Sequence, residues 1–112
     1  MSIAGDLIRG HTDAIILARL IRGDSYGYEI NKTISILSSG QFELKEATLY
    51  TAFKRLEEAG FITSYWGDSG AGARRRYYTI TPIGREASHR LTREWLETKE
   101  IMDKLLLSEV PL

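Results

Sequence analysis

Apolar residues recur at helical spacings in three successive stretches of the first half of the chain. The predicted helices span residues 7–21, about 25–37 and 46–59. The residues expected to face the core are Leu7, Ile8, Ile15, Ile16 and Leu20 in the first helix, Tyr26, Ile30, Ile34 and Leu37 in the second, and Leu49, Phe53 and Leu56 in the third. Three helices are therefore expected before any strand.

Start and stop signals support these boundaries. Gly23 is placed to end the first helix, and Asp24 or Ser25 can cap the second. Glu46 complements the positive N-terminus of the third helix, and Gly60 is placed as its C-terminal stop.

The period then changes to that of a β-hairpin. Residues 61–66 and 75–80 are rich in β-branched and aromatic side chains, and the glycine-rich stretch 67–73 separates them. Thr81 and Pro82 signal the start of another helix, with Thr81 as cap and Pro82 at the first helical position. Roughly 26 residues follow without a breaker, enough for a helix of about 39 Å.

This order of elements predicts an α+β fold, mostly α, of the winged helix-turn-helix type. We expect residues 1–80 to form the winged domain and residues 81–112 to form a C-terminal dimerisation helix. An apolar seam on that helix has no expected partner within the winged domain, which we call the head. This predicts a homodimer. The seam consists of Leu91, Trp95, Met102 and Leu105, with polar Thr98 in its middle.

Composition indicates a soluble, single-domain protein, and the distribution of charge bears on whether it binds nucleic acid. The chain is 43% hydrophobic and 27% charged, has no cysteine, and carries no membrane-length apolar run, so we expect a cytoplasmic protein without disulfides. The net charge of zero is unusual for a nucleic-acid binder. However, residues 45–90 contain eight basic and five acidic residues, a local charge of +3.

Polar side chains on and just before the third helix lie away from its core-facing stripe. Hydroxyl and ammonium groups there can reach base edges and phosphates of double-stranded DNA. The alternative is that they form only the solvated face of an amphipathic helix. The candidate DNA-binding residues of this segment are Lys45, Thr48, Tyr50, Thr51 and Lys54.

Three consecutive arginines, Arg74, Arg75 and Arg76, follow the glycine-rich stretch. Guanidinium groups bind phosphate bidentately, and glycines let a hairpin tip lie close to a duplex. Because strand residues alternate between faces, at least one of the three is expected to be structural. The alternative is a solvated strand that pairs with Asp68 or Glu57.

These motifs together resemble the PadR family of bacterial transcriptional regulators. The resemblance implies a homodimer that binds a palindromic operator near the gene it represses and is released by small molecules or stress. Ala73 departs from the pattern, since the family more often has a second glycine before the arginines. The motifs are residues 26–30 (YGYEI), 46–50 (EATLY), 56–62 (LEEAGFI), 65–67 (YWG), 74–78 (RRRYY) and 81–85 (TPIGR).

The single C-terminal helix is similar to that of a compact branch of the family, which includes a multidrug-binding repressor. This similarity implies that Trp95 helps form an apolar slot for planar aromatic molecules at the dimer centre. Thr92 stands where an aromatic residue is found, and Lys99 where an acid is found, so Trp95 could instead be only a dimer anchor. The expected ligand-binding residues are Leu7, Asp13, Ala14, Ala18, Thr92, Trp95, Lys99 and Met102.

No pattern favours an enzyme, a metal site or a cofactor. His11 and His89 lie on different predicted helices without partners at metal-ligand spacing. The leading hypothesis is therefore a ligand-responsive repressor. A ligand-independent regulator, or an adaptor that binds proteins with the same dimeric scaffold, remains the alternative.

Overall fold

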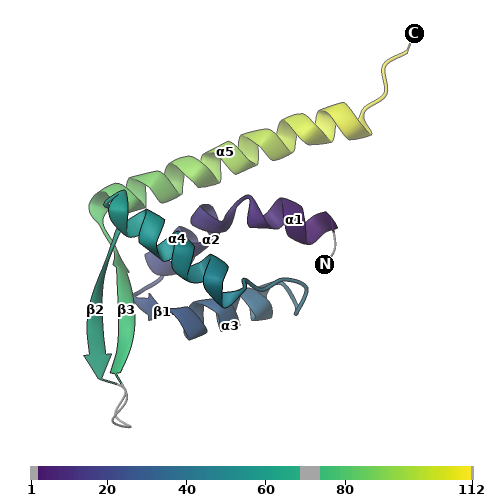
Figure 1. The fold of residues 1–112 in the computed structure, drawn as a ribbon. Coiled ribbons are helices and arrows are strands. Elements are labelled where there is room, and N and C mark those ends of the chain that lie inside the picture. Colours follow the sequence, from purple (N-terminus) through teal and green to yellow (C-terminus); the bar gives the residue numbers. More distant parts are fainter. Residues whose placement is uncertain (1–2, 69–73, 112) are drawn as a thin grey trace.

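The computed structural model describes residues 3–68 and 74–111, and Figure 1 shows the arrangement of its elements. The chain is mostly helical with one small antiparallel sheet, so the predicted fold class is confirmed. In chain order the elements are α1 (Ile3–Arg9), α2 (Thr12–Ile21), β1 (Ser25–Tyr26), α3 (Gly27–Leu37), α4 (Glu46–Glu58), β2 (Ile62–Asp68), β3 (Arg74–Ile80) and α5 (Pro82–Leu107).

The first predicted helix was wrong in one respect, because it is two helices. Gly10 has low helix propensity, and the hydroxyl of Thr12 donates to the carbonyl of Arg9 at 2.7 Å, which favours a turn at this point. The turn directs α1 away from the core. Leu7 is therefore 70% exposed, whereas Ile16 and Leu20 of α2 are buried.

The predicted cap of the second helix was also wrong. Ser25 pairs with Tyr78 in the short strand β1, its hydroxyl donates to Glu29 at 2.6 Å, and α3 begins only at Gly27. In residues 3–68, four helices and a short strand therefore precede or lead into the hairpin, where three helices were expected. Leu37 was wrongly expected in the core. It lies at the end of α3 and is 64% exposed.

Helix α4 matches its prediction closely. Leu49, Phe53 and Leu56 are buried, and Gly60 ends the helical segment with a positive φ of 78°. The loop before α4 is clamped by Asn31 of α3. Its side chain donates to the carbonyl of Leu44 at 2.7 Å and accepts from the amide of Leu44 at 2.8 Å, so the entry of α4 is tied to α3.

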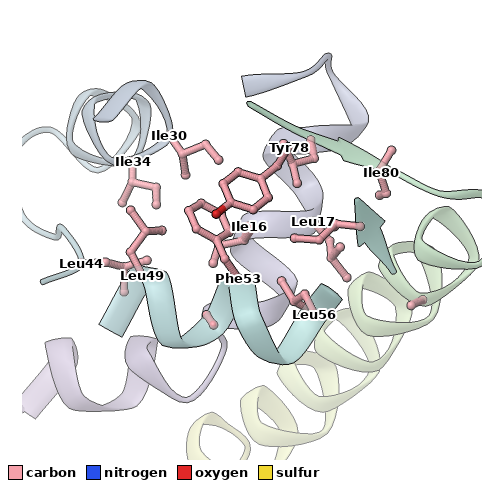
Figure 2. Packing of buried hydrophobic residues seen from close by; sticks show 14 of the residues in the cluster. Ile16, Leu17, Ile30, Ile34, Leu44, Leu49, Phe53, Leu56, Tyr78 and Ile80 are labelled. Atoms are coloured by element: carbon pink, nitrogen blue, oxygen red, sulfur yellow. The ribbon is translucent and has the colours of Figure 1, made fainter. Parts of the chain in front are cut away.

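The three strands pair in the order β1-β3-β2, with β3 in the centre. One sheet face carries Ile62, Tyr78 and Ile80 into the core, where they meet α2 and α4. Figure 2 shows Tyr78 lying over Phe53, and their ring centroids are 3.9 Å apart. The hairpin is thus packed directly on α4.

Helix α5 begins on the head and then leaves it. Thr81 caps the helix by accepting from the amide of Gly84 at 3.1 Å, as the sequence predicted. Ala87 is buried and Leu91 packs against the core of its own head. The expectation that Leu91 needs a second chain as its partner was therefore wrong.

The C-terminal end of α5 extends past the other helices in Figure 1, and the molecule measures 68 Å along its longest axis. The 26 residues of α5 agree with the length predicted from the sequence. In the part of the chain that the structure describes, no helix is both long and apolar enough to cross a membrane.

Candidate nucleic-acid interface

The exposed face of α4 presents the polar residues singled out in the sequence. Lys45, Tyr50, Thr51 and Lys54 are exposed, and Thr48 is half-buried. All lie at or beyond the clamped entry of α4, so a rigid support carries them. The core-facing stripe uses none of them, which leaves their donors and acceptors available to a ligand that covers this face.

Tyr50 is held in place while part of its ring stays exposed. Its ring meets Phe53 edge-on at 5.7 Å, and a Cβ atom added at Gly27 would lie 3.0 Å from its hydroxyl oxygen. The side chain is 47% exposed. Gly27 therefore leaves room for the tyrosine ring at the start of α3, and Tyr50 presents a defined edge to solvent.

The β2–β3 hairpin is the wing of this fold. Its three arginines, Arg74, Arg75 and Arg76, divide between the two faces of β3. The guanidinium of Arg76 lies 3.3 Å from the carboxylate of Glu57 on α4, and that of Arg74 lies 5.3 Å from the ring centre of Trp66. Arg75 points to the opposite face, 4.6 Å over the ring of Tyr26. Strand alternation thus places Arg74 and Arg76 on the side of α4.

Glu57 joins α4 to the wing. It pairs with Arg76 and accepts a hydrogen bond from the hydroxyl of Ser64 at 3.1 Å. The sequence analysis allowed that an arginine of this strand pairs with Glu57, and Arg76 does so. Because both side chains are partly exposed, the pair is worth only about 0–1 kcal/mol, and a phosphate can compete with Glu57 for the guanidinium. A pair with Asp68 falls outside the described side chains.

A groove of about 390 Å³ lies between α4 and the wing. Burial raises the pKa of the Tyr78 phenol at its base. This groove makes the polar face of α4 continuous with Arg76. Its lining residues are Tyr50, Lys54, Glu57, Glu58, Arg76 and Tyr78.

The opposite wing face is a ladder of aromatic rings. Tyr77 stacks on Tyr65 with centroids 5.6 Å apart and meets Tyr26 edge-on at 5.3 Å. The hydroxyl of Tyr65 donates to Asp24 at 2.7 Å, which raises the pKa of Tyr65. Hydrogen bonds from Thr79 and then Tyr65 lower the pKa of Asp24. These contacts tie β2 and β3 to the segment before α3.

Two adjoining cavities lie where α5 crosses α2. The larger, about 460 Å³, has a polar wall that includes Asp13, Arg55 and Glu94. The smaller, about 270 Å³, is mainly apolar and is lined by Ile8, His11, Ala14, Ile15, Leu91, Thr92 and Trp95. The ring of His11 meets the ring of Trp95 edge-on at 5.4 Å. Trp95 lines both cavities and stays 47% exposed.

Comparison with known proteins decides what this scaffold is. The family model of the transcriptional regulator PadR-like family matches residues 16–90, more than half of the chain. The chain belongs to the PadR-like family. It is therefore a DNA-binding regulator of transcription, and the resemblance seen in the sequence is confirmed.

Individual relatives of this PadR-like chain support the family assignment. A transcriptional regulator from Clostridium thermocellum, Cth-833, is 48% identical, with 94% of this chain and 99% of that chain covered and a TM-score of 0.84. A PadR family regulator from Clostridium difficile R20291 is 36% identical, with 86% and 98% covered and a TM-score of 0.75. An uncharacterised protein from Lysinibacillus sphaericus is 46% identical over 90% of this chain and 93% of its own length.

The structure of this PadR-like protein brings together only some of the predicted ligand residues. Asp13, Ala14, Thr92 and Trp95 line the two cavities, whereas Leu7, Ala18, Lys99 and Met102 line neither. The cavity residues that sequence reasoning missed include His11, Arg55, Leu91 and Glu94. Helical periodicity could not identify them because it does not say which helices cross or where.

One predicted feature cannot be placed in the structure. The glycine-rich tip, including Ala73, falls on residues 69–73, which lie outside the described residues. Among the described residues, no three histidine, cysteine, aspartate or glutamate side chains lie close enough together to hold a metal ion.

Proposed function

We propose that this PadR-like regulator is a cytoplasmic, homodimeric repressor that binds a palindromic DNA operator and is released by a planar aromatic small molecule beside Trp95. The observation that carries the DNA-binding part is the shared surface of α4 and the wing. The polar face of α4, the groove beside it and Arg76 form one continuous side of the head.

In this proposal α4 enters the major groove of the duplex. Thr48, Tyr50 and Thr51 contact base edges and the adjoining backbone, because their hydroxyls can donate and accept. Lys45, Lys54, Arg74 and Arg76 neutralise phosphates. Arg75 is the structural arginine of the three, because it stacks over Tyr26 on the far side of the sheet.

The dimer rests on one stripe of α5. On this stripe Ala87 is buried in its own head and Leu91 is partly buried there. Trp95, Met102 and Leu105 continue the stripe at helical spacings and stay 45–72% exposed. A second copy that lays its own stripe against this one removes the exposed apolar surface from water. Two heads then face a duplex with two-fold symmetry, which suits a palindromic site.

The ligand site is supported by the cavities next to Trp95. Their volumes are within or near the range of small-molecule sites, and the smaller one presents mostly apolar surface to a flat ring. Trp95 supplies the aromatic face against which such a ring can stack. Because Trp95 also lies on the dimer stripe, an occupant can change how the two heads are held.

The test begins by selecting DNA fragments with the purified protein from a random pool. Enriched fragments that share an inverted repeat, with protection of both halves, support the proposal. Planar aromatic compounds are then titrated into a Trp66→Phe protein, so that quenching reports on Trp95 alone. Quenching accompanied by weaker DNA binding supports ligand release. No enrichment would refute operator binding, and unaltered fluorescence with unaltered DNA affinity would refute the ligand response.

A further inference from the structure

The two cavities beside Trp95 differ in chemistry but share a wall. His11, Ala14, Leu91 and Trp95 line both of them. A flat ring in the apolar cavity can therefore carry a substituent that extends into the polar one. The charge that this substituent meets depends on the ion pairs around the polar cavity.

Three ion pairs include a residue of the polar cavity, counted over residues 3–68 and 74–111. Arg9 pairs with Asp6 one turn earlier, and Arg90 pairs with Glu94 one turn later, so both pairs stay within one helix. The third pair, Asp13 with Arg55, joins α2 to α4. It is the ion pair through which an occupant of this cavity can act on the DNA-binding helix.

The Asp13–Arg55 pair is both well formed and accessible. Both carboxylate oxygens of Asp13 accept from Arg55, one from Nε at 3.2 Å and the other from a terminal nitrogen. Arg55 lies in the last turn of α4, and its hydrogen bond to Asp13 raises its pKa. The side chains of Arg55 and Asp13 are 54% and 38% exposed, so a solute can reach them, and an exposed pair is easily replaced.

We propose that the Asp13–Arg55 pair is the link between the cavity and the DNA-binding helix, and that an aromatic cation opens it by taking Asp13 as its counter-ion. This inference rests on the proposed ligand response and names its chemical class and route. The ring of the cation occupies the apolar cavity against Trp95, and its positive charge faces Asp13. Arg55 then loses its partner on α2, and the last turn of α4 loses its polar tie to the head.

The size of the effect follows from linkage. If the pair is intact in the DNA-bound state and broken in the cation-bound state, each ligand weakens the other by the same factor. An exposed ion pair with two hydrogen bonds corresponds to a factor of about five, which is about 1 kcal/mol. In this inference DNA binding requires the orientation of α4 that the pair holds. Asp13→Asn breaks the same pair without a ligand, so the variant should already bind DNA more weakly, by at most about fivefold.

The test uses two probes of nearly the same shape that differ in charge, N-methylquinolinium and 1-methylnaphthalene. DNA affinity of the full-length Trp66→Phe protein is measured by anisotropy of a labelled, selected duplex, with and without each probe. Trp95 fluorescence without DNA gives the affinity for each probe. Asp13→Asn is compared with Glu94→Gln, because Glu94 is a second carboxylate of the same cavity whose partner lies on its own helix. Circular dichroism checks the folding of each variant, and the duplex alone controls for direct binding of the probe to DNA.

We expect N-methylquinolinium to weaken DNA binding about fivefold in the reference protein and in Glu94→Gln, and less than twofold in Asp13→Asn. The neutral 1-methylnaphthalene should bind without a comparable effect on DNA. Asp13→Glu keeps the charge and should retain the response. Full coupling in Asp13→Asn, or loss of coupling only in Glu94→Gln, would overturn the inference.

The outcomes separate the route from the ligand response itself. If both probes quench Trp95 and weaken DNA binding equally, the ligand response stands and the Asp13–Arg55 route is wrong. If neither probe changes Trp95 fluorescence or DNA affinity, both the ligand response and the route are wrong.

Discussion

The ring of Tyr78 on β3 stacks on the ring of Phe53 on α4, with centroids 3.9 Å apart and planes 18° from parallel. This contact joins the β2–β3 hairpin to α4 through the core, because both side chains are buried. The polar face of α4 and the arginines of β3 are thereby held in one orientation.

Phe53→Ala should therefore destabilise the whole head. Removing a buried phenylalanine costs about 3–5 kcal/mol, and here the loss also separates the wing from α4. Tyr28→Ala is the control, since Tyr28 is 72% exposed and its loss should change the unfolding free energy by less than about 0.5 kcal/mol. Urea denaturation measures both variants. Equal stabilities for the two would show that the stacked pair is not part of the core.

Gly84 provides a test of the junction between head and α5. A Cβ atom at this position would lie 2.0 Å from the carbonyl oxygen of Phe61, so Gly84→Ala should cost at least about 1–3 kcal/mol. Gly10→Ala is the matched control, because its Cβ would meet the nearest atom at an ordinary 3.4 Å. Thermal unfolding should separate the two variants clearly. A Gly84→Ala protein as stable as Gly10→Ala would mean that α5 is seated differently.

The hydrogen bonds that Asp24 accepts from Thr79 and Tyr65 predict a dependence of stability on pH. The pKa of Asp24 is lowered in the folded state, so its contribution is present above the unfolded value of about 3.9 and is lost as pH falls through the folded pKa. Wild type should therefore lose more stability than Asp24→Asn as the pH falls from about 5 to about 2, a range that brackets the unfolded pKa of aspartate. The difference should be small because Asp24 is exposed. Parallel stability profiles for the two proteins would contradict this contribution.

The stripe on α5 predicts how the proposed dimer can be disrupted. Leu105→Glu places a charge on the exposed stripe without touching the core of its own head, and should convert the dimer to monomer. Lys104→Glu introduces the same residue on the other side of α5, where Lys104 pairs with Glu100, and should leave the dimer intact. Sedimentation velocity distinguishes the two results. A dimeric Leu105→Glu protein would place the interface elsewhere.

The sequence predicted the features that depend on local pattern. The stripe of α4, the cap at Thr81 and the length of α5 all follow from spacing and from residue type. The order of these elements predicted the winged fold, and the family resemblance supplied the regulatory class. The local features agree with the structure because neighbouring residues along the chain determine them.

The errors concern contacts between distant residues. The strand at Ser25 exists only because Tyr78, far along the chain, pairs with it. Leu91 was assigned to a second copy because its partner, the core of its own head, cannot be read from the periodicity of α5. The Asp13–Arg55 pair likewise depends on how α2 and α4 cross, so no local motif could have indicated it.

The most direct test of the central claim is the salt dependence of DNA binding. For a selected duplex, the logarithm of the affinity should fall steeply with the logarithm of salt concentration, since bound phosphates release counter-ions. Arg74→Gln and Arg76→Gln should each lower the slope by about 0.9 for every phosphate that is no longer neutralised, or about 2 for the dimer, on specific and non-specific DNA alike. Arg75→Gln, whose parent side chain stacks over Tyr26 on the other face, should leave the slope nearly unchanged. A flat salt dependence in wild type, or equal slopes in all the proteins, would contradict the assignment of this surface to DNA and favour a protein-binding adaptor.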